Sequence, residues 1–138
     1  MRTTYFDEWN VEKKKIHEKE PPSFYIKPRQ VWFTKMGENI GSEQNGKKEF
    51  SRPVLVLSQV GSLFFTVALT TKGKPTNSFY LKLKDISMNE DHLEHLGNSW
   101  LILSQVRVMD KRRFLEKIGT VGQEEFGEIK QKLTTLLL

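Results

Sequence analysis

The sequence contains no cysteine and no apolar segment long enough to span a lipid bilayer. The absence of thiols excludes a disulfide framework and thiolate metal sites, and it agrees with a cytoplasmic location. The first residues are polar and charged, unlike those of a secretory signal peptide. We therefore expect a cytoplasmic protein that makes no membrane contact.

Histidine is scarce as well, with three residues in a chain of 138. Two of them, His92 and His95, lie close together in a polar segment. A zinc site would need at least one further ligand, and the neighbouring sequence supplies none. We therefore interpret both as surface histidines and expect neither a metal site nor a cofactor.

Acidic residues are outnumbered by basic ones. The chain has 22 Lys and Arg against 17 Asp and Glu, which gives a net charge of +5. This excess favours a polyanionic partner, although lysine-rich surfaces also serve solubility alone. Hydrophobic residues make up 37% of the chain. This share is typical of a globular protein, and the length fits one domain.

Apolar residues recur at helical spacing near the N-terminus, over residues 3–19. Thr3 or Thr4 is a suitable N-cap for this helix, and we expect Phe6 and Trp9 to pack onto the rest of the protein. The same segment carries three consecutive lysines. They could contact phosphates, but such a run is more often a solvated helix face, and we prefer that interpretation.

The remainder of the chain shows short strands separated by turn signals. Gly61 is typical of a tight hairpin turn, Asp110 is expected to cap a short turn, and residues 85–98 are polar and turn-like. Many short strands with one closing helix predict a small antiparallel β-barrel. The expected strands cover residues 31–33, 54–57, 63–69, 78–83, 100–103 and 115–121, and the strand at 100–103 runs into Gln105 and Arg107. The closing helix is expected over residues 123–137, with an apolar stripe of Phe126, Ile129, Leu133, Leu136 and Leu137.

The segment of residues 29–58 organises the rest of the chain. It consists of two expected strands joined by a polar loop that contains several glycines. Arg52-Pro53 stands where the second strand is expected to begin, a position where the missing proline N–H breaks no ladder. Arg52 therefore lies at the end of a strand and faces a loop that contains Glu43. This placement suits a functional site better than a core.

Several segments resemble the MazF/PemK-like toxin family in order and spacing. They are VW at 31–32, GSEQ at 41–44, RPVLVLS at 52–58, ALTTK at 68–72, LSQVRVMDK at 103–111 and FLEKIG at 114–119. The resemblance covers the chain from about residue 27 to its end. It implies a mainly β (α+β) fold, an SH3-like small antiparallel β-barrel with an N-terminal and a C-terminal helix. Residues 1–28 would then form an accessory helix with a proline-containing linker, and residues 29–138 the barrel domain.

The resemblance also implies a function. Members of the family are toxins of type II toxin-antitoxin systems that act as metal-independent, sequence-selective endoribonucleases on single-stranded RNA and mRNA, which inhibits growth. We expect the same of this chain, as a homodimer inhibited by a cognate antitoxin protein. Contact with operator DNA is expected only through the antitoxin. Two other interpretations stay open: a noncatalytic nucleic-acid-binding barrel, and a gyrase-directed toxin that acts by binding protein.

RNA can be cut without a metal ion when the ribose 2′-hydroxyl attacks the adjacent phosphorus. The protein must then supply a base, donors for the phosphorane oxygens and an acid for the leaving oxygen. Arg52 suits the second role, because its guanidinium stays charged and can donate two parallel hydrogen bonds. The family places its matching arginine near the leaving group. The alternative is a surface arginine at a strand start.

Thr70 and Glu43 complete the candidate catalytic set. The hydroxyl of Thr70 can donate to a phosphate oxygen, which is the role of the matching threonine in the family. Thr71 is a second donor, or only a strand-forming residue. Glu43 is the candidate base, or else a loop glutamate that caps nearby N–H groups. We expect further RNA contacts from Gln44, Lys47, Lys48, Phe50, Thr71, Lys72, Ser104, Gln105 and Arg107.

The chain departs from the family pattern at two places. Many members carry an acid at the position of Ser104, and a serine cannot act as a base unaided. The loop before Arg52 is longer than usual, because residues 46–51 add two lysines and Phe50. This segment would widen the RNA groove, hold a flipped base against Phe50, or be a tolerated insertion.

Overall fold

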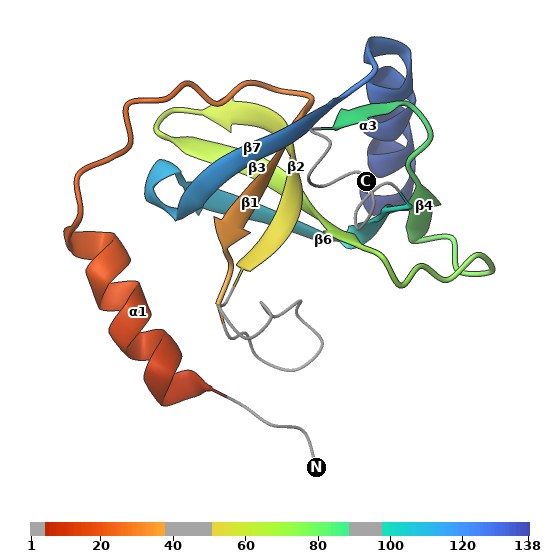
Figure 1. Ribbon diagram of the computed structural model, residues 1–138. Helices are drawn as coiled ribbons and strands as arrows, with labels where there is room; N and C mark the ends of the chain where they lie inside the picture. The colour runs from red at the N-terminus through yellow and green to blue at the C-terminus, as the bar shows by residue number, and fades with distance from the viewer. Residues whose placement is uncertain (1–4, 38–50, 89–97) are drawn as a thin grey trace.

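The computed structural model describes residues 5–37, 51–88 and 98–138. The strands in these ranges form one antiparallel sheet in the order β4-β6-β3-β2-β1-β7-β5 (Figure 1). The strands are β1 (Gln30–Lys35), β2 (Ser51–Val60), β3 (Leu63–Thr70), β4 (Tyr80–Lys82), β5 (Ile86–Met88), β6 (Trp100–Asp110) and β7 (Phe114–Val121). The helices are α1 (Phe6–Glu18), the short 3-10 helix η1 (Lys111–Arg113) and α3 (Gln123–Leu137).

The sheet has two apolar faces, because side chains alternate along each strand. One face packs against α3 and shares a buried cluster with it. This cluster includes Val31, Leu55, Leu69, Phe126, Ile129 and Leu133. The apolar stripe of α3 therefore covers one side of the sheet and belongs to the main core.

The other face closes around the interior of the barrel. Its buried cluster takes residues from β1, β2, β3, β6 and β7. Phe114 meets two other rings edge-on, with centroid distances of 5.9 Å to Trp32 and 5.5 Å to Phe64. Val54 belongs to the same cluster. Arg52 lies two residues before Val54 on β2, so it continues this row toward the end of the barrel.

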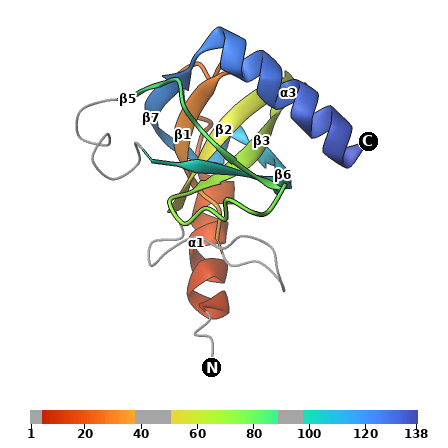
Figure 2. The same cartoon turned by 90° about the vertical axis from the view of Figure 1, so that its right-hand side faces the viewer.

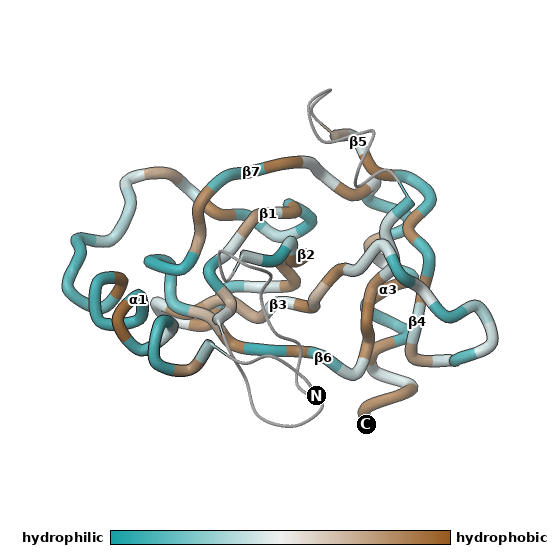
Figure 3. Tube along the Cα trace, turned by 60° about the horizontal axis from the view of Figure 1, so that its bottom comes forward, coloured by the Kyte–Doolittle hydropathy of each residue, from teal (hydrophilic) through white to brown (hydrophobic). Residues whose placement is uncertain are grey.

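α1 lies on the side of the barrel opposite α3 (Figure 2). It buries only two side chains, Trp9 and Ile16, in a small cluster of their own. The Trp9 ring lies against Gly37 so closely that no Cβ fits there, and Gly37 has a φ of +84°. Glycine is the residue that meets both conditions. The rest of α1 is mostly hydrophilic, as its teal turns in Figure 3 show.

The predicted helices are confirmed, with corrections at their ends. α3 has the expected bounds, and α1 lies within the expected range. The predicted cap is wrong, because Tyr5 occupies the N-cap position without a side-chain cap bond, while Thr3 and Thr4 lie outside the described residues. Phe6 and Leu137 were expected to be buried, yet they are 48% and 45% exposed. Each lies in a terminal turn, beyond the part of its helix that is packed.

The strand predictions need three corrections. The segment expected to be turn-like contains β5, which pairs with β7. With three residues, β5 is too short to show an alternating pattern. The strand expected over 78–83 is shorter, because β4 covers only Tyr80–Lys82, and Phe79 just before it is 37% exposed. β6 continues past Arg107, because it pairs with β3 as far as Asp110.

Two turns and the fold class are as predicted. Gly61 has a φ of +62° in the β2–β3 hairpin. The Asp110 carboxylate accepts a hydrogen bond from the backbone N–H of Arg112 at 2.9 Å, which caps η1. The protein is a mainly β, antiparallel barrel with a helix at each end of the chain.

Candidate functional site

Arg52 is the second residue of β2, at the end of the barrel where β1 finishes. It pairs with Thr34 of β1, whose hydroxyl donates to the backbone carbonyl of Arg52 at 3.1 Å. The Arg52 side chain is half-buried, and this burial lowers its pKa. Pro53 was expected at the start of this strand, but it is the third residue of β2. The ladder with β3 begins only at Val54, so the missing N–H interrupts no pair on that side.

Thr70 ends β3 and lies level with Arg52. The β2–β3 register pairs Val54 with Ala68, and Arg52 and Thr70 each lie two residues further toward the same end. Two residues are one period of a strand, so both side chains belong to the face that carries Val54 and Ala68. The Thr70 hydroxyl oxygen accepts a hydrogen bond from the N–H of Lys72 at 3.1 Å. Its own proton can still be donated to a phosphate oxygen.

An irregularity in β6 places Ser104 and Gln105 near the row formed by Arg52 and Thr70. The β3–β6 register changes between Val67 and Leu69, where β3 advances by two residues and β6 by five. The extra residues of β6 therefore bulge opposite Ala68, the neighbour of the Arg52–Thr70 row. Ser104 is exposed and Gln105 is half-buried in this bulge. Bulges often redirect side chains beside active sites.

Two further arginines converge on the end of β1. Arg107 of β6 donates from Nη1 to the backbone carbonyl of Met36 at 3.2 Å. Arg113 of η1 donates to the same carbonyl at 3.4 Å. Met36 comes two residues after Thr34, the strand partner of Arg52. Three half-buried arginines from three elements therefore gather at one end of the barrel.

The charge of Arg113 is strongly affected by this environment. Burial, together with the like charge of Arg107, lowers the pKa of Arg113 to about 10, and Asp110 acts in the opposite direction. The guanidinium stays protonated at neutral pH. An anion that enters would offset the loss of hydration and the repulsion between the two arginines, so the arrangement suits a phosphate. Sequence reasoning missed Arg113, although a basic run at 111–113 directly follows the LSQVRVMD segment.

The other predicted site residues fall into two groups. Thr71 and Lys72 are exposed, directly after the end of β3. Outside the described residues lie the candidate base Glu43, the possible contacts Gln44, Lys47, Lys48 and Phe50, and the histidines His92 and His95. The structure thus brings Arg52, Thr70 and Arg107 to one end of the barrel, next to the bulge of β6.

Within residues 5–37, 51–88 and 98–138, no group of three or more His, Asp or Glu side chains is placed to hold a metal ion. In the same ranges no helix has the length and apolar character needed to cross a membrane. The polar groups gathered at the end of the barrel are guanidinium, hydroxyl and amide groups, which bind phosphate oxygens by donating hydrogen bonds.

The segments that build this end of the barrel also carry the likeness to known proteins. Residues 27–137 match the family model of the PemK-like, MazF-like toxin of type II toxin-antitoxin systems. The chain belongs to this toxin family. The match includes the whole sheet, η1 and α3, whereas α1 lies outside it. The family predicted from the sequence is therefore confirmed.

Solved structures of MazF-like toxins share the fold. MazF from Deinococcus radiodurans is 23% identical, with a TM-score of 0.63 over 83% of this chain and 98% of that chain. An endoribonuclease in complex with its cognate antitoxin, from Mycobacterial species, is 17% identical, with a TM-score of 0.58 over 82% of this chain and 95% of that chain. A search of curated protein sequences found no match to this MazF-like toxin.

Proposed function

We propose that this toxin is a metal-independent, sequence-selective endoribonuclease that cuts single-stranded RNA by attack of the ribose 2′-hydroxyl. The observation that carries the proposal is the alignment of Arg52 with Thr70 on one face of the sheet, at the end where Arg107 and Arg113 converge. Membership of the toxin family supports it, as does the presence of endoribonucleases among the similar structures.

In this reaction the 2′-oxygen forms a bond to phosphorus, and the bond from phosphorus to the 5′-oxygen breaks. The products are a 2′,3′-cyclic phosphate and a 5′-hydroxyl. Negative charge develops on the nonbridging oxygens of the phosphorane, where Arg52 supplies two parallel N–H donors and Thr70 a hydroxyl donor. Because the Arg52 side chain is half-buried, these hydrogen bonds are stronger than they would be in water.

Glu43 is the proposed base, and Ser104 is a proposed RNA contact in place of the acid that many family members carry. The variant Ser104→Asp tests this division of roles. If the strength of the base limits the reaction, Ser104→Asp cuts RNA faster. If Glu43 already serves as base, the added carboxylate repels RNA and weakens binding, more so at low salt. One rate measurement therefore decides where the base lies.

We also propose how the toxin assembles. The similar structures include an endoribonuclease with its cognate antitoxin and a MazE–MazF complex from Deinococcus radiodurans. By analogy this chain forms a homodimer in the cytoplasm and is inhibited by a cognate antitoxin, through which any contact with operator DNA is made. Residues 1–28 are proposed as an accessory unit attached to a barrel domain at 29–138.

The test of the enzymatic proposal uses purified protein, a chelator and a long single-stranded RNA. Discrete cuts that leave 5′-hydroxyl ends are expected. Arg52→Lys keeps the charge but loses the planar pair of donors, so cleavage should fall by about a hundredfold or more. Arg29→Lys is the matched control, because Arg29 lies near the opposite end of the β1–β2 pair, where its backbone N–H donates to Val56 at 3.0 Å.

The outcomes separate the three interpretations. Cleavage by Arg52→Lys at the parent rate overturns the catalytic assignment of Arg52. RNA binding without cleavage by the parent protein favours the noncatalytic barrel. If the parent protein neither binds nor cleaves RNA, the interpretation that remains is a toxin directed at a protein. Inhibition of gyrase is the direct assay for it.

A further inference from the structure

A second cationic site lies where α1 meets η1. The two elements enclose a cleft of about 160 Å³. It is lined by Trp9, Lys13, Ile16, His17, Asp110, Arg112 and Arg113. The lining comes from both sides of the contact, so the cleft exists only because α1 is docked onto the barrel.

The charges around the cleft are mostly positive. The single carboxylate, Asp110, already pairs with Arg112, whose Nη1 lies 3.3 Å from Oδ2. Arg113 donates to backbone carbonyls, and its guanidinium lies over the Trp9 ring, 5.5 Å from the centroid. Lys13 lines the opposite wall, on α1. Because the charges of Asp110 and Arg112 offset each other, the cations left in the cleft are Lys13 and Arg113. The imidazole of His17 lines the cleft beside them.

Arg113 links the cleft to the candidate site. Arg113 lines the cleft and also donates to the Met36 carbonyl. Arg107 of the candidate site donates to the same carbonyl. The Met36 carbonyl oxygen is therefore a common partner of Arg107 in the candidate site and Arg113 in the cleft. A polyanion bound at Arg107 could extend to the cleft along these positive charges.

The Trp9 ring cannot take part in base recognition. It is 6% exposed, with Arg113 over it and Gly37 packed against it. Stacking of a nucleobase would need an open ring face. The groups that remain accessible in the cleft are cations, which recognise phosphate and carry no base information.

We propose that the cleft between α1 and η1 binds a backbone phosphate of the RNA, away from the phosphate that is cut, through Lys13, His17 and Arg113. This inference rests on the proposed ribonuclease function and extends it. α1 lies outside the segment that matches the toxin family, so Lys13 and His17 belong to an N-terminal segment beyond the match, whereas Arg113 lies within it. This phosphate subsite increases affinity for long RNA without changing which sequence is cut.

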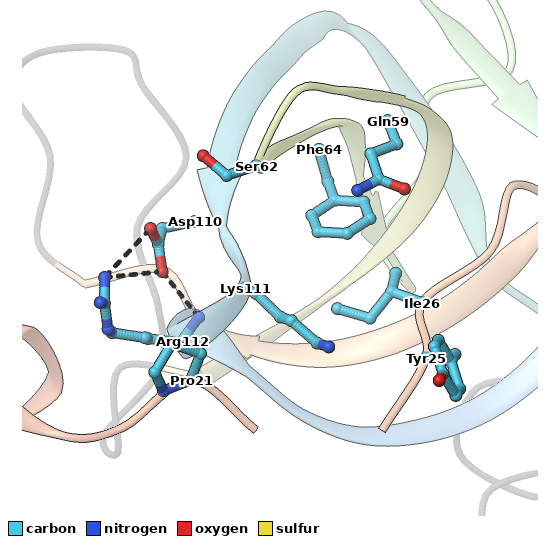
Figure 4. Close-up of a pocket in the computed structure, with 9 residues that line it drawn as sticks. All are labelled: Pro21, Tyr25, Ile26, Gln59, Ser62, Phe64, Asp110, Lys111 and Arg112. Carbon is cyan, nitrogen blue, oxygen red and sulfur yellow. Dashed lines mark hydrogen bonds and ion pairs between the residues drawn. The ribbon is translucent and has the colours of Figure 1, made fainter. Parts of the chain in front are cut away.

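A neighbouring pocket of about 380 Å³ differs from this cleft (Figure 4). It lies on the other side of the Asp110–Arg112 pair, and Ile26 and Phe64 line it with apolar surface. Its lysine, Lys111, is already near aromatic rings, 5.9 Å from the Phe24 centroid and 5.8 Å from that of Tyr25. This pocket therefore has fewer accessible cationic groups to bind a phosphate than the cleft between α1 and η1.

The test compares two lysines of the same helix. Lys13→Gln and Lys15→Gln each remove one charge from an exposed position of α1, but only Lys13 lines the cleft. Binding is measured against salt concentration with a 2′-O-methyl single-stranded RNA, which this mechanism cannot cut. Loss of one phosphate contact should reduce the slope of log K against log salt by about 0.7. We expect this change for Lys13→Gln, equally for RNAs of different sequence, and a smaller one for Lys15→Gln.

A cleavage assay gives the second readout. Lys13→Gln should lower kcat/KM for a long RNA and leave it unchanged for an RNA too short to reach the cleft. Equal salt slopes for the two variants overturn the subsite, even when the parent protein cuts RNA. If the parent protein does not cut RNA but the variants show the expected salt slopes, the proposed subsite stands and the proposed enzymatic function is overturned. If Lys13→Gln weakens binding of a polyglutamate peptide and not of RNA, the cleft serves a protein partner and the RNA assignment is overturned.

Discussion

The two long helices are attached to the barrel by different kinds of contact. α3 places Phe126, Ile129 and Leu133 in a buried cluster shared with the sheet. α1 buries only Trp9 and Ile16, in a cluster that includes no strand residue. The apolar area that stabilises α3 is part of the core, so α3 should fold and unfold with the barrel.

The attachment of α1 depends on arginines at the functional end of the molecule. The Arg113 guanidinium lies over the Trp9 ring, and Arg112 donates from Nε to the backbone carbonyl of Lys19, the C-cap of α1, at 3.0 Å. One helix therefore completes the fold, while the other is held in part by Arg113, a residue that is also placed to meet a phosphate. The following variants test this difference.

The largest effect is expected from truncating the core side of α3. Ile129 is fully buried, so Ile129→Ala should lower the free energy of unfolding by about 2–5 kcal/mol. Denaturant unfolding monitored by circular dichroism measures the change. Ile16→Ala makes the same substitution in α1 and should cost clearly less, because α1 can undock without opening the barrel. Equal losses for the two variants would show that α1 is part of the core.

The next effect concerns the contact between Gly37 and Trp9. Gly37→Ala forces an L-residue into the left-handed region, which costs about 1–2 kcal/mol, and its Cβ would also displace the Trp9 ring. Gly61→Ala is the control, because Gly61 has a φ of +62° with open space around it. Gly37→Ala should therefore lose more stability and also lose hydrogen-exchange protection in α1. Identical behaviour of the two variants contradicts the tight docking of Trp9.

A smaller, stabilising effect is expected in α3. Gly127 is exposed within the helix, and a Cβ there would meet nothing within 4 Å. Gly127→Ala should therefore raise the free energy of unfolding by up to about 1 kcal/mol, because alanine has the higher helix propensity. The thermal midpoint of the barrel should rise with it. A local change confined to α3, with the barrel midpoint unchanged, would contradict the coupling of α3 to the core.

The smallest effect is expected from the ion pair that links α1 to β1. Glu12 and Lys35 lie 3.8 Å apart, and both side chains are partly exposed. Glu12→Gln should cost about 0.5 kcal/mol or less, and the difference should vanish in high salt. Thermal melts at low and high ionic strength measure it. A loss above 1 kcal/mol would mean that electrostatics, rather than the packing of Trp9, positions α1.

The parts of the fold that the sequence predicted are those encoded by local patterns. The bounds of α3 follow from an uninterrupted apolar stripe, and the turn at Gly61 follows from one residue type. Phe6 was misassigned, because a stripe shows which residues share a helix face and not where the partner surface ends. β5 was missed, because its position depends on pairing with β7, which is distant in sequence.

The candidate site divides in the same way. Family motifs identified Arg52, Thr70 and Arg107, but their proximity follows from strand register, which no short segment encodes. The bulge that carries Ser104 arises from a change of register between β3 and β6, so it is invisible in the sequence of β6 alone. Arg113 was missed because a basic run normally indicates a solvated surface, and here η1 turns one of its side chains inward onto the end of β1.

Arg113 has a thermodynamic consequence that follows from its two sets of contacts. Its guanidinium lies over the Trp9 ring of α1 and also donates a hydrogen bond to the Met36 carbonyl at the end of the barrel. An anion whose affinity depends on docked α1 must, by linkage, strengthen the docking of α1 by the same factor. Binding of an anion near Arg113 should therefore change the environment of the Trp9 indole ring, which lies against the Arg113 guanidinium. Tryptophan fluorescence can measure this change.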